Sequence, residues 1–481
     1  MKSKELSWLR AFRLSAKDPT ISLALVLVAG AFINDWQIAM HVPAEDFYRN
    51  WVVVRAVARG KVENIYSPEG RANICRAYVG RELIEPKTGR RVFATRVGAS
   101  EREIAAAQAC HIADREYFGS EGLATVATPF LYSVFQVFTG SNRGGDYEAD
   151  CRFYTMFRFA CYAISVLALC RLLRYSLAAG LLMLALLAAW FEPLRIELAA
   201  GNVNPVQLGL LTLFLCLQSR KMGRAGTVSG GIVIALAVMF KPNIALVAPA
   251  VGLLWAANQR YARILLTAAG VAVGTLLALG VSAAFFGSMR CWLQWSDTLR
   301  QSLLQNQQPV SHGNIGLSRL VVEWSGWDIS IYLFVVLSFV FLAATVLGRR
   351  QKAEPDAASD AADTGDPALR EAYLGVCAGV AMMLLSARLV WPHYFLLVAP
   401  MLIWACGPVG DTNKQPDRRS LVGRLVGLFS LLLLSNLSHL VPCSPFFVNI
   451  ATFVLLMLVL WDIYDDPGQV LSLGGNQGRT A

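Results

Sequence analysis

The sequence predicts an all-α polytopic membrane protein, and three observations support this class. Hydrophobic residues make up 55% of the 481-residue chain and charged residues only 16%, a balance that soluble domains rarely show. Uncharged runs of nearly twenty residues recur along the chain, and each matches the roughly 30 Å of hydrocarbon that a helix must cross. Clusters of Lys and Arg follow alternate runs. Closed barrels lack such runs, so the spanning elements are expected to be helices.

About twelve transmembrane helices are expected from these runs. They are placed at residues 19–43, 151–174, 176–196, 204–219, 225–240, 243–258, 263–287, 328–348, 371–390, 394–410, 420–440 and 446–464. The chain then divides into a cytoplasmic basic N-terminus (1–18), a first span (19–43), an extracytoplasmic loop with interfacial helices (44–150), a transmembrane core (151–348), a cytoplasmic linker (349–370), C-terminal transmembrane helices (371–464) and a cytoplasmic tail (465–481). The linker is assigned as flexible because it is rich in Ala and Asp and lacks periodic apolar positions.

The basic residues predict the orientation, because Lys and Arg in short loops stay on the cytoplasmic side during insertion. The clusters lie before the first span and in every second loop after it. We therefore expect a multi-pass protein of the cell inner (plasma) membrane with both termini in the cytoplasm and an uncleaved first span. The net charge of +10 then follows from topology. No nucleic-acid partner is expected, since the cations are spread over separate loops without a reading element.

The loop at residues 44–150 is the main polar insertion, and loops of this length in compact folds are usually functional. Its segment Asp46–Arg59 places apolar residues at helical spacing with arginines around the rest, which predicts an amphipathic interfacial helix. The apolar stretch Pro129–Phe138 is too short to span and predicts a second surface or re-entrant helix. Cys75 and Cys110 lie in the same loop, and the sequence leaves open whether they form a disulfide.

Two ionisable residues stand out at the predicted outer surface. Asp46 begins the first interfacial helix, where it could act as a general base or simply cap the helix, and the sequence leaves both interpretations open. Lys241 separates two apolar segments of about sixteen residues, too short to span fully, so they are expected to form a hairpin with a recessed turn. A recessed lysine needs either to reach the surface or to meet an anion, and we favour an anion.

Other polar residues are expected on the same side of the membrane. They are Arg195, Asn202, Asn204, His312, Arg319 and His393. Asn204 before Pro205 also fits a helix start, and a lone histidine at a membrane surface commonly only packs. Their convergence on one side nevertheless indicates a single site. No metal is expected there, since the external loops carry no Asp-x-Asp pair and the chain has no Walker A motif.

Five short motifs occur in a recognisable order. They are Asp46-Phe47-Tyr48 followed by Gly60 and Tyr66, Gly-Asn-Val-Asn at 201–204, Phe-Lys-Pro at 240–242, Asn306-Gln307 before a Gly...Arg-Leu segment, and Pro-His-Tyr at 392–394. Over roughly residues 30–410 this set resembles glycosyltransferase family 87. The resemblance implies a GT-C-like bundle of about 12 transmembrane helices with a large first extracytoplasmic loop. It also implies a mannosyltransferase that uses a polyprenyl-phosphate donor, with Asp46 as the catalytic base.

The expected reaction transfers a single mannose-like sugar from a polyprenyl-phosphate donor to a lipid or glycan acceptor on the extracytoplasmic side. Asp46 would take the proton of the acceptor hydroxyl, and Lys241 with Arg195 or His393 would stabilise the departing phosphate. A single displacement gives inversion. The remaining expected donor-phosphate or substrate-binding residues are Asn202, Asn204, Asn306, Gln307, His312 and Arg319. The partners are the donor, the acceptor and the bilayer, and no cofactor is expected.

Two other classes remain open. An O-antigen ligase or polymerase-like enzyme would also use a lipid-linked donor at a large external loop, but it would transfer a whole glycan from a pyrophosphate carrier. A lipid or sugar transporter could use the polar residues as a translocation path. It should have two related halves with discontinuous helices, and the sequence shows no such halves.

Overall fold

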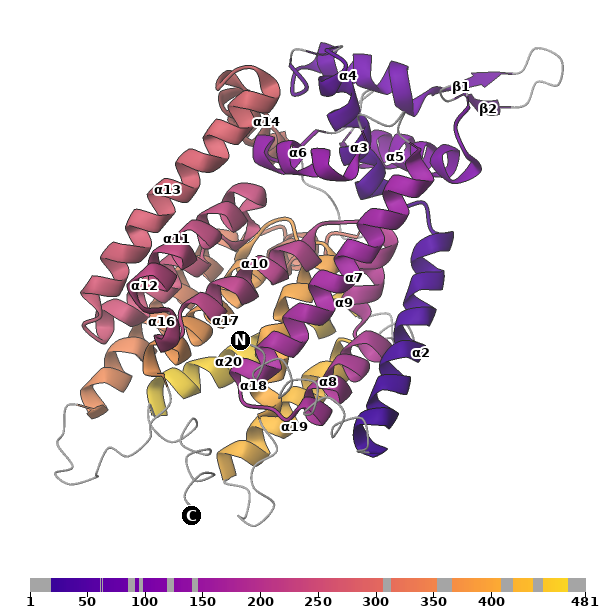
Figure 1. Ribbon diagram of the computed structural model, residues 1–481. Coiled ribbons are helices and arrows are strands. Elements are labelled where there is room, and N and C mark those ends of the chain that lie inside the picture. Colours follow the sequence, from indigo (N-terminus) through magenta and orange to yellow (C-terminus); the bar gives the residue numbers. More distant parts are fainter. Residues whose placement is uncertain are drawn as a thin grey trace, which may run out of the picture.

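A computed structural model describes residues 19–60, 62, 64–84, 91–94, 98–118, 125–140, 146–305, 313–352, 366–407, 418–435 and 444–465. A bundle of helices lies beneath a smaller cap formed mainly by the first loop (Figure 1). The predicted all-α polytopic class is confirmed, because seven of the described helices are long and apolar enough to cross a membrane. A short antiparallel hairpin in the cap, β1 (Arg81–Ile84) with β2 (Arg91–Ala94), is the small exception to helical structure within the described ranges.

The bundle combines long and short helices. The seven long ones are α2 (Pro19–His41), α7 (Tyr147–Leu172), α11 (Gly223–Phe240), α13 (Tyr261–Phe286), α16 (Ser330–Lys352), α17 (Pro367–Ser386) and α20 (Ser444–Asp465). The shorter ones are α8 (Leu177–Trp190), α9 (Glu192–Ala200), α10 (Asn204–Leu217), α12 (Val247–Ala257), α18 (Ala399–Cys406) and α19 (Arg418–Leu433). Within the described residues each expected span contains helix, although seven helices alone are long and apolar enough to cross by themselves, so the count of about twelve stays a prediction.

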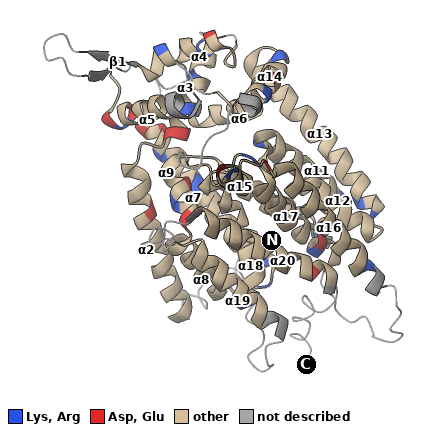
Figure 2. Ribbon diagram, turned by 180° about the vertical axis from the view of Figure 1, so that it is seen from behind, with Lys and Arg blue, Asp and Glu red and all other residues tan. Residues whose placement is uncertain are grey.

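The burial of the long helices separates core from periphery. Of the most apolar window of α17, 89% is buried, so this helix lies at the centre of the bundle. The corresponding windows of α2 and α13 are only 17% buried, and their outward leucines and valines form an apolar surface suited to lipid. Figure 2 shows the same division, since charged residues are scarce along the bundle helices and more frequent in the cap and at the opposite end.

The expected span 176–196 is broken near its end. Phe191 is extended (φ −84°, ψ 95°), and the amide N–H of Glu192 donates to the carbonyl of Leu434 at 3.0 Å. Pro193 then occupies the first turn of α9, where its missing N–H is tolerated, whereas it would disrupt a continuous helix. The prediction of one unbroken span was therefore wrong at this point. After the break, α9 packs against α2 and also contacts α3 of the cap.

The predicted hairpin at Lys241 is present. The helix α11 ends at Phe240, Lys241 is extended (φ −152°, ψ 109°), and Pro242 begins the short helix η4 (Pro242–Ile244) that leads into α12. The residue before a proline avoids the α-region, which explains why the helix ends here. The hairpin turn is held from two sides, because Gln207 donates to the carbonyl of Lys241 at 2.8 Å and Thr128 donates to that of Phe240 at 3.0 Å.

The cap has its own hydrophobic core. Its helices are α3 (Glu45–Ala58), α4 (Pro68–Ile74), η1 (Cys75–Val79), α5 (Glu101–Phe118), α6 (Pro129–Phe135) and η2 (Gln136–Phe138), and α14 (Arg290–Gln305) joins them from later in the chain. The short helix α15 (Leu317–Ser325) instead packs against α17 of the bundle. The prediction of α3 as an interfacial helix was wrong, because Phe47, Trp51 and Val52 are each fully buried and the helix is covered on nearly every side. An amphipathic pattern does not distinguish a membrane surface from a covering layer of protein, and here α5 and α6 provide the cover.

Cys75 and Cys110 of the first loop form no disulfide in the described part of the chain, so the structure does not contain the bridge that the sequence left open. Both are buried. The thiol of Cys110 donates to the carbonyl of Glu45 at 3.3 Å, and the thiol of Cys75 lies 3.9 Å from the carbonyl of Gly80. They therefore pack within the cap as small, weakly polar side chains.

Candidate active site

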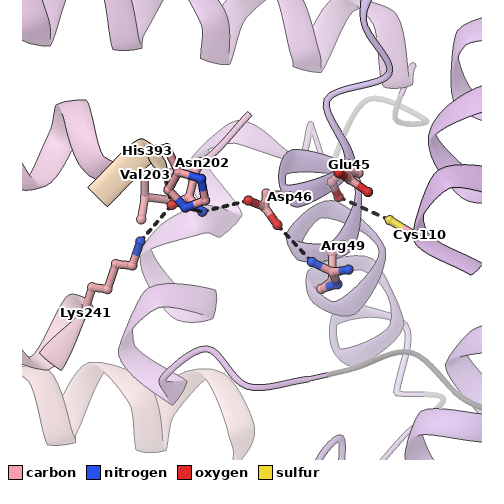
Figure 3. Close-up of polar contacts among 8 residues, drawn as sticks. All are labelled: Glu45, Asp46, Arg49, Cys110, Asn202, Val203, Lys241 and His393. Carbon is pink, nitrogen blue, oxygen red and sulfur yellow. Dashed lines mark hydrogen bonds and ion pairs between the residues drawn. The ribbon is translucent and has the colours of Figure 1, made fainter. Parts of the chain in front are cut away.

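Asp46 lies on the first turn of α3, next to the bundle. One of its carboxylate oxygens accepts from Arg49 at 2.8 Å and the other from the amide of Asn202 at 2.7 Å (Figure 3). The position that precedes the helix is Ala44, and it makes no side-chain cap. The Asp46 carboxylate therefore contacts one side chain of its own helix and one from the turn after α9, rather than the free N–H groups at the start of α3.

Gly201 explains how Asn202 comes so close to Asp46. It ends α9 in a left-handed conformation (φ 75°), which glycine adopts without a Cβ penalty. A Cβ added at Gly201 would lie 3.0 Å from the Cβ atoms of both Ala44 and Phe47. The glycine thus allows the turn between α9 and α10 to pass directly against the start of α3.

The Asn202 amide is engaged at both ends. Its nitrogen donates to Asp46 and lies 3.1 Å from Nε2 of His393, and its oxygen accepts from Nζ of Lys241 at 2.9 Å and from the backbone N–H of Val203 at 2.6 Å. Because the amide nitrogen can only donate, Nε2 of His393 accepts and the ring proton sits on Nδ1. In this arrangement His393 is neutral, and Lys241 supplies the cation.

Lys241 carries its charge among neutral partners. Its ammonium donates to the side-chain oxygens of Asn202 at 2.9 Å and Asn204 at 2.8 Å, and it lies 4.2 Å from the centre of the Tyr394 ring. Burial lowers the pKa of Lys241 to about 8, although Glu197 and Asp46 act in the opposite direction. Since its hydrogen bonds go to amides rather than to a carboxylate, the ammonium keeps charge available for an incoming anion.

A second polar layer supports this first one. Glu197, on α9, is fully buried and accepts from both the backbone N–H of Asn204 at 3.1 Å and its side-chain nitrogen at 2.7 Å. The same side-chain nitrogen donates to the carbonyl of His393 at 3.0 Å. Burial raises the pKa of Glu197 to about 7, while Lys241 and Arg158 oppose that rise. Glu197 lies in the polar stretch 192–205, but the sequence gives no sign of its role, because its partner Asn204 follows the turn at Gly201.

The structure brings Asp46, Asn202, Asn204, Lys241 and His393 into one hydrogen-bonded network, but it does not bring all the expected residues there.

Arg195 lies 3.9 Å from Glu192 on its own helix, and Arg319 pairs with Glu323 on α15 at 3.3 Å. Arg195 is two positions before Glu197, so it points to a different face of α9. Asn306, Gln307 and His312 lie outside the described residues. Within the described ranges, no three His, Cys, Asp or Glu side chains come together as a metal site.

The fold and the site together define a multi-pass membrane protein that holds a carboxylate and a lysine around one amide, at the junction of cap and bundle. The family model of glycosyltransferase family 87 matches residues 128–364 and confirms the resemblance seen in the motifs. The matched region is just under half of the chain, and its similarity to glycosyltransferase family 87 indicates a membrane glycosyltransferase. The match includes Asn202, Asn204 and Lys241, whereas Asp46 precedes it and His393 follows it. No curated protein and no solved structure matches the chain.

Proposed function

We propose that the protein transfers a single mannose-like sugar from a polyprenyl-phosphate donor to a hydroxyl of a lipid or glycan acceptor, with inversion at the anomeric carbon. One observation carries the proposal: Asp46 and Lys241 hydrogen-bond the two ends of the Asn202 amide. A proton acceptor and a cation thus lie one amide group apart. A displacement at a sugar phosphate needs this pair, one group for the attacking hydroxyl and one for the leaving phosphate.

The proposed reaction is a single displacement. The acceptor oxygen attacks the anomeric carbon and its proton passes to Asp46, while the bond between the anomeric carbon and the phosphate oxygen breaks and its electron pair leaves with the prenyl phosphate. Lys241 stabilises the negative charge on the leaving group. Arg49, at 2.8 Å, orients the Asp46 carboxylate. Attack from the face opposite the phosphate inverts the anomeric configuration.

The donor class follows from the proposed side of the membrane. We propose that the site faces outward from the cell inner membrane and that both termini lie in the cytoplasm, because the basic clusters follow alternate apolar runs. No nucleotide pool exists there, so the sugar must arrive with its own leaving group. A prenyl chain would lie in the bilayer against the apolar outer helices. The single ammonium of Lys241 matches the single negative charge of a phosphodiester.

The test is a panel of labelled donors offered to the purified protein in lipid nanodiscs. The panel contains prenyl-phosphate mannose, prenyl-phosphate glucose, a prenyl-pyrophosphate sugar and a nucleotide sugar, each with a cell-envelope lipid extract as acceptor. We expect labelled product from a monophosphate donor, with the inverted anomer seen by NMR. Transfer from the pyrophosphate carrier alone would support the ligase-like alternative. Transfer from the nucleotide sugar, or retention of configuration, would overturn the proposal.

A further inference from the structure

Glu197 is a buried carboxylate close to the site but one layer away from the reacting groups. It is fully buried, and its carboxylate oxygens contact Asn204 rather than Asp46 or Lys241. Its main-chain carbonyl accepts from Arg158 at 2.9 Å. Burying a carboxylate is costly unless its oxygens are satisfied, so its presence in this position calls for a functional or structural reason.

The contacts of Asn204 indicate what Glu197 does. Glu197 and the carbonyl of His393 both accept from the Asn204 side-chain nitrogen, at 2.7 and 3.0 Å. That nitrogen is therefore turned away from Lys241, and the amide oxygen faces the ammonium at 2.8 Å. If the amide were reversed, its N–H groups would oppose the ammonium and two acceptors would face an oxygen. The two acceptors thus fix which end of Asn204 Lys241 meets.

The charge of Glu197 acts on Lys241 as well. The two side chains are separated by one amide group, since Asn204 contacts both. A nearby negative charge favours the protonated form of a lysine, against the effect of burial. The other titratable or charged groups that face this pair come from α3, α7 and η6 (Pro392–Val398). They are Asp46, Tyr154, Arg158, His393 and Tyr394.

We propose that Glu197 is a positioning residue for the donor phosphate, which orients the Asn204 amide and holds Lys241 as an ammonium ready to receive an anion. The role for the phosphate rests on the proposed function. The effect on Lys241 does not, because it concerns groups of the chain alone. The two parts can therefore be tested separately.

The first test measures the titration of Lys241 without any ligand. Lys241 is partly accessible, so competitive labelling by acetic anhydride at a series of pH values, read by mass spectrometry, reports its pKa. In Glu197→Gln we expect the pKa of Lys241 to fall by roughly one unit, the usual effect of losing a nearby opposite charge. Glu192→Gln, on the same helix but paired toward Arg195, is the matched control and keeps the wild-type value. An unchanged pKa in folded Glu197→Gln overturns the inference.

The second test measures binding of a prenyl phosphate without sugar. We expect Glu197→Gln to weaken its affinity about tenfold, the loss typical of a disturbed hydrogen bond to a charged group. Glu197→Asp keeps the charge but reaches less far, so it should retain the pKa of Lys241 and lose part of the affinity. Wild-type affinity in Glu197→Gln overturns the positioning role. A shifted pKa in Glu197→Gln together with no binding of prenyl phosphate by the wild type supports the link from Glu197 to Lys241 and overturns the proposed donor.

A further variant covers the case in which Glu197→Gln does not fold. Asn204→Leu has similar volume and removes the amide through which Glu197 acts, while the carboxylate remains. We expect the same direction of change, a lower pKa for Lys241 and a weaker affinity for prenyl phosphate. A folded Asn204→Leu protein with wild-type values for both overturns the inference.

Discussion

Asp46 and Lys241 hydrogen-bond opposite ends of the Asn202 side-chain amide, at 2.7 and 2.9 Å. The amide has a fixed orientation, because its nitrogen can only donate and its oxygen can only accept. A displacement of either charged residue must therefore disturb the other through Asn202. The proposed base and the proposed phosphate ligand are in this sense one unit, although they lie on elements almost two hundred residues apart in the chain.

The first prediction concerns the proposed base. Asp46→Asn removes the proton acceptor but keeps the shape of the side chain and an oxygen that can accept from Asn202. We expect sugar transfer to fall by roughly 10²- to 10⁴-fold, the usual contribution of general base catalysis. Donor affinity should stay near the wild-type value, because Lys241 is unchanged. Turnover and donor binding of the purified variant are the measurements.

Asp146→Asn is the matched control for that experiment. Asp146 is exposed and accepts from the backbone N–H of Glu148 at the start of α7, a cap that asparagine provides equally well. This variant should retain full turnover. If folded Asp46→Asn also retains full turnover, Asp46 is not the base.

The second prediction is a pH dependence that arises from Lys241. Burial lowers its pKa to about 8, so the ammonium is present at neutral pH and is lost as the pH rises through that value. A phosphodiester does not titrate in this range. We therefore expect donor affinity to be nearly constant at neutral pH and to decline above about pH 8, measured without acceptor as the dissociation constant of a prenyl-phosphate sugar, a phosphodiester, between pH 6 and 9.5.

Lys241→Arg separates this titration from other effects of alkaline pH. Arginine keeps its charge throughout the range. Whatever its donor affinity at pH 7, the Lys241→Arg variant should therefore show no decline in that affinity above pH 8. Lys241→Ala should bind donor weakly at every pH. A wild-type affinity that is as high at pH 9.5 as at pH 7, or an arginine variant with the same decline as the wild type, contradicts the assignment of Lys241 to the phosphate.

Some of this architecture could be predicted from the sequence because apolar length is a local property. Each expected span needed only a run of uncharged residues, and each coincides with helix in the described ranges. The hairpin at Lys241 was predictable for the same reason, since Phe-Lys-Pro interrupts one long apolar block. The break at Phe191 was not predicted. It depends on Pro193 and on a backbone contact with Leu434, which lies far away in the sequence.

The site was predictable only in part, for a physical reason. Counting spans placed Asp46, Lys241 and His393 on one side of the membrane, and the structure joins them through Asn202. Counting gives no angle around a helix, so Arg195 was included although its side chain lies toward Glu192. It also gives no partner across a turn, and for that reason Glu197, although it lies in the same polar stretch as Asn202 and Asn204, was not assigned to the site. The burial of α3 depends on α5 and α6, which no local pattern reveals.

The third prediction concerns the turn that carries Asn202. Gly201→Ala introduces a Cβ that would lie 3.0 Å from the Cβ atoms of Ala44 and Phe47, and it adds the cost of a left-handed alanine, roughly 1–2 kcal/mol. The start of α3 must shift away, and Asp46 moves with it. We expect turnover per folded molecule to fall at least tenfold, since displacements of about 1 Å near reacting groups cost this much or more.

Gly60→Ala is the matched control for this substitution. Gly60 is also left-handed (φ 62°), but a Cβ there would have no neighbour within 4 Å. The Gly60→Ala substitution therefore has the free-energy cost of a left-handed alanine but introduces no steric clash. Turnover of Gly60→Ala should equal that of the wild type. Equal turnover in Gly201→Ala and Gly60→Ala would show that close contact between α9 and α3 is not needed for activity.

The fourth prediction concerns the crossing of α11 and α13, because α11 leads into Lys241. The helices α11 and α13 approach closely where Gly231 faces Gly270, and a Cβ at Gly270 would lie 2.1 Å from the carbonyl oxygen of Val228. Small residues at such crossings allow helix backbones to touch in a membrane. Because α11 ends directly before Lys241, we expect that a shift of α11 at this crossing also moves the ammonium. Gly270→Val should separate the helices and destabilise the fold by roughly 1–3 kcal/mol.

Gly280→Val on the same helix is the control, because a Cβ there meets nothing within 4 Å. Both variants make the same Gly→Val exchange in α13, but Gly270 is buried and Gly280 is exposed. Thermal unfolding in detergent, followed by size-exclusion chromatography, should show a lower melting temperature for Gly270→Val and a wild-type value for Gly280→Val. Prenyl-phosphate affinity should fall in the first variant alone, since only that substitution displaces the end of α11. Equal melting temperatures for the two variants would contradict the close crossing, and a destabilised Gly270→Val with wild-type affinity would show that the crossing does not position Lys241.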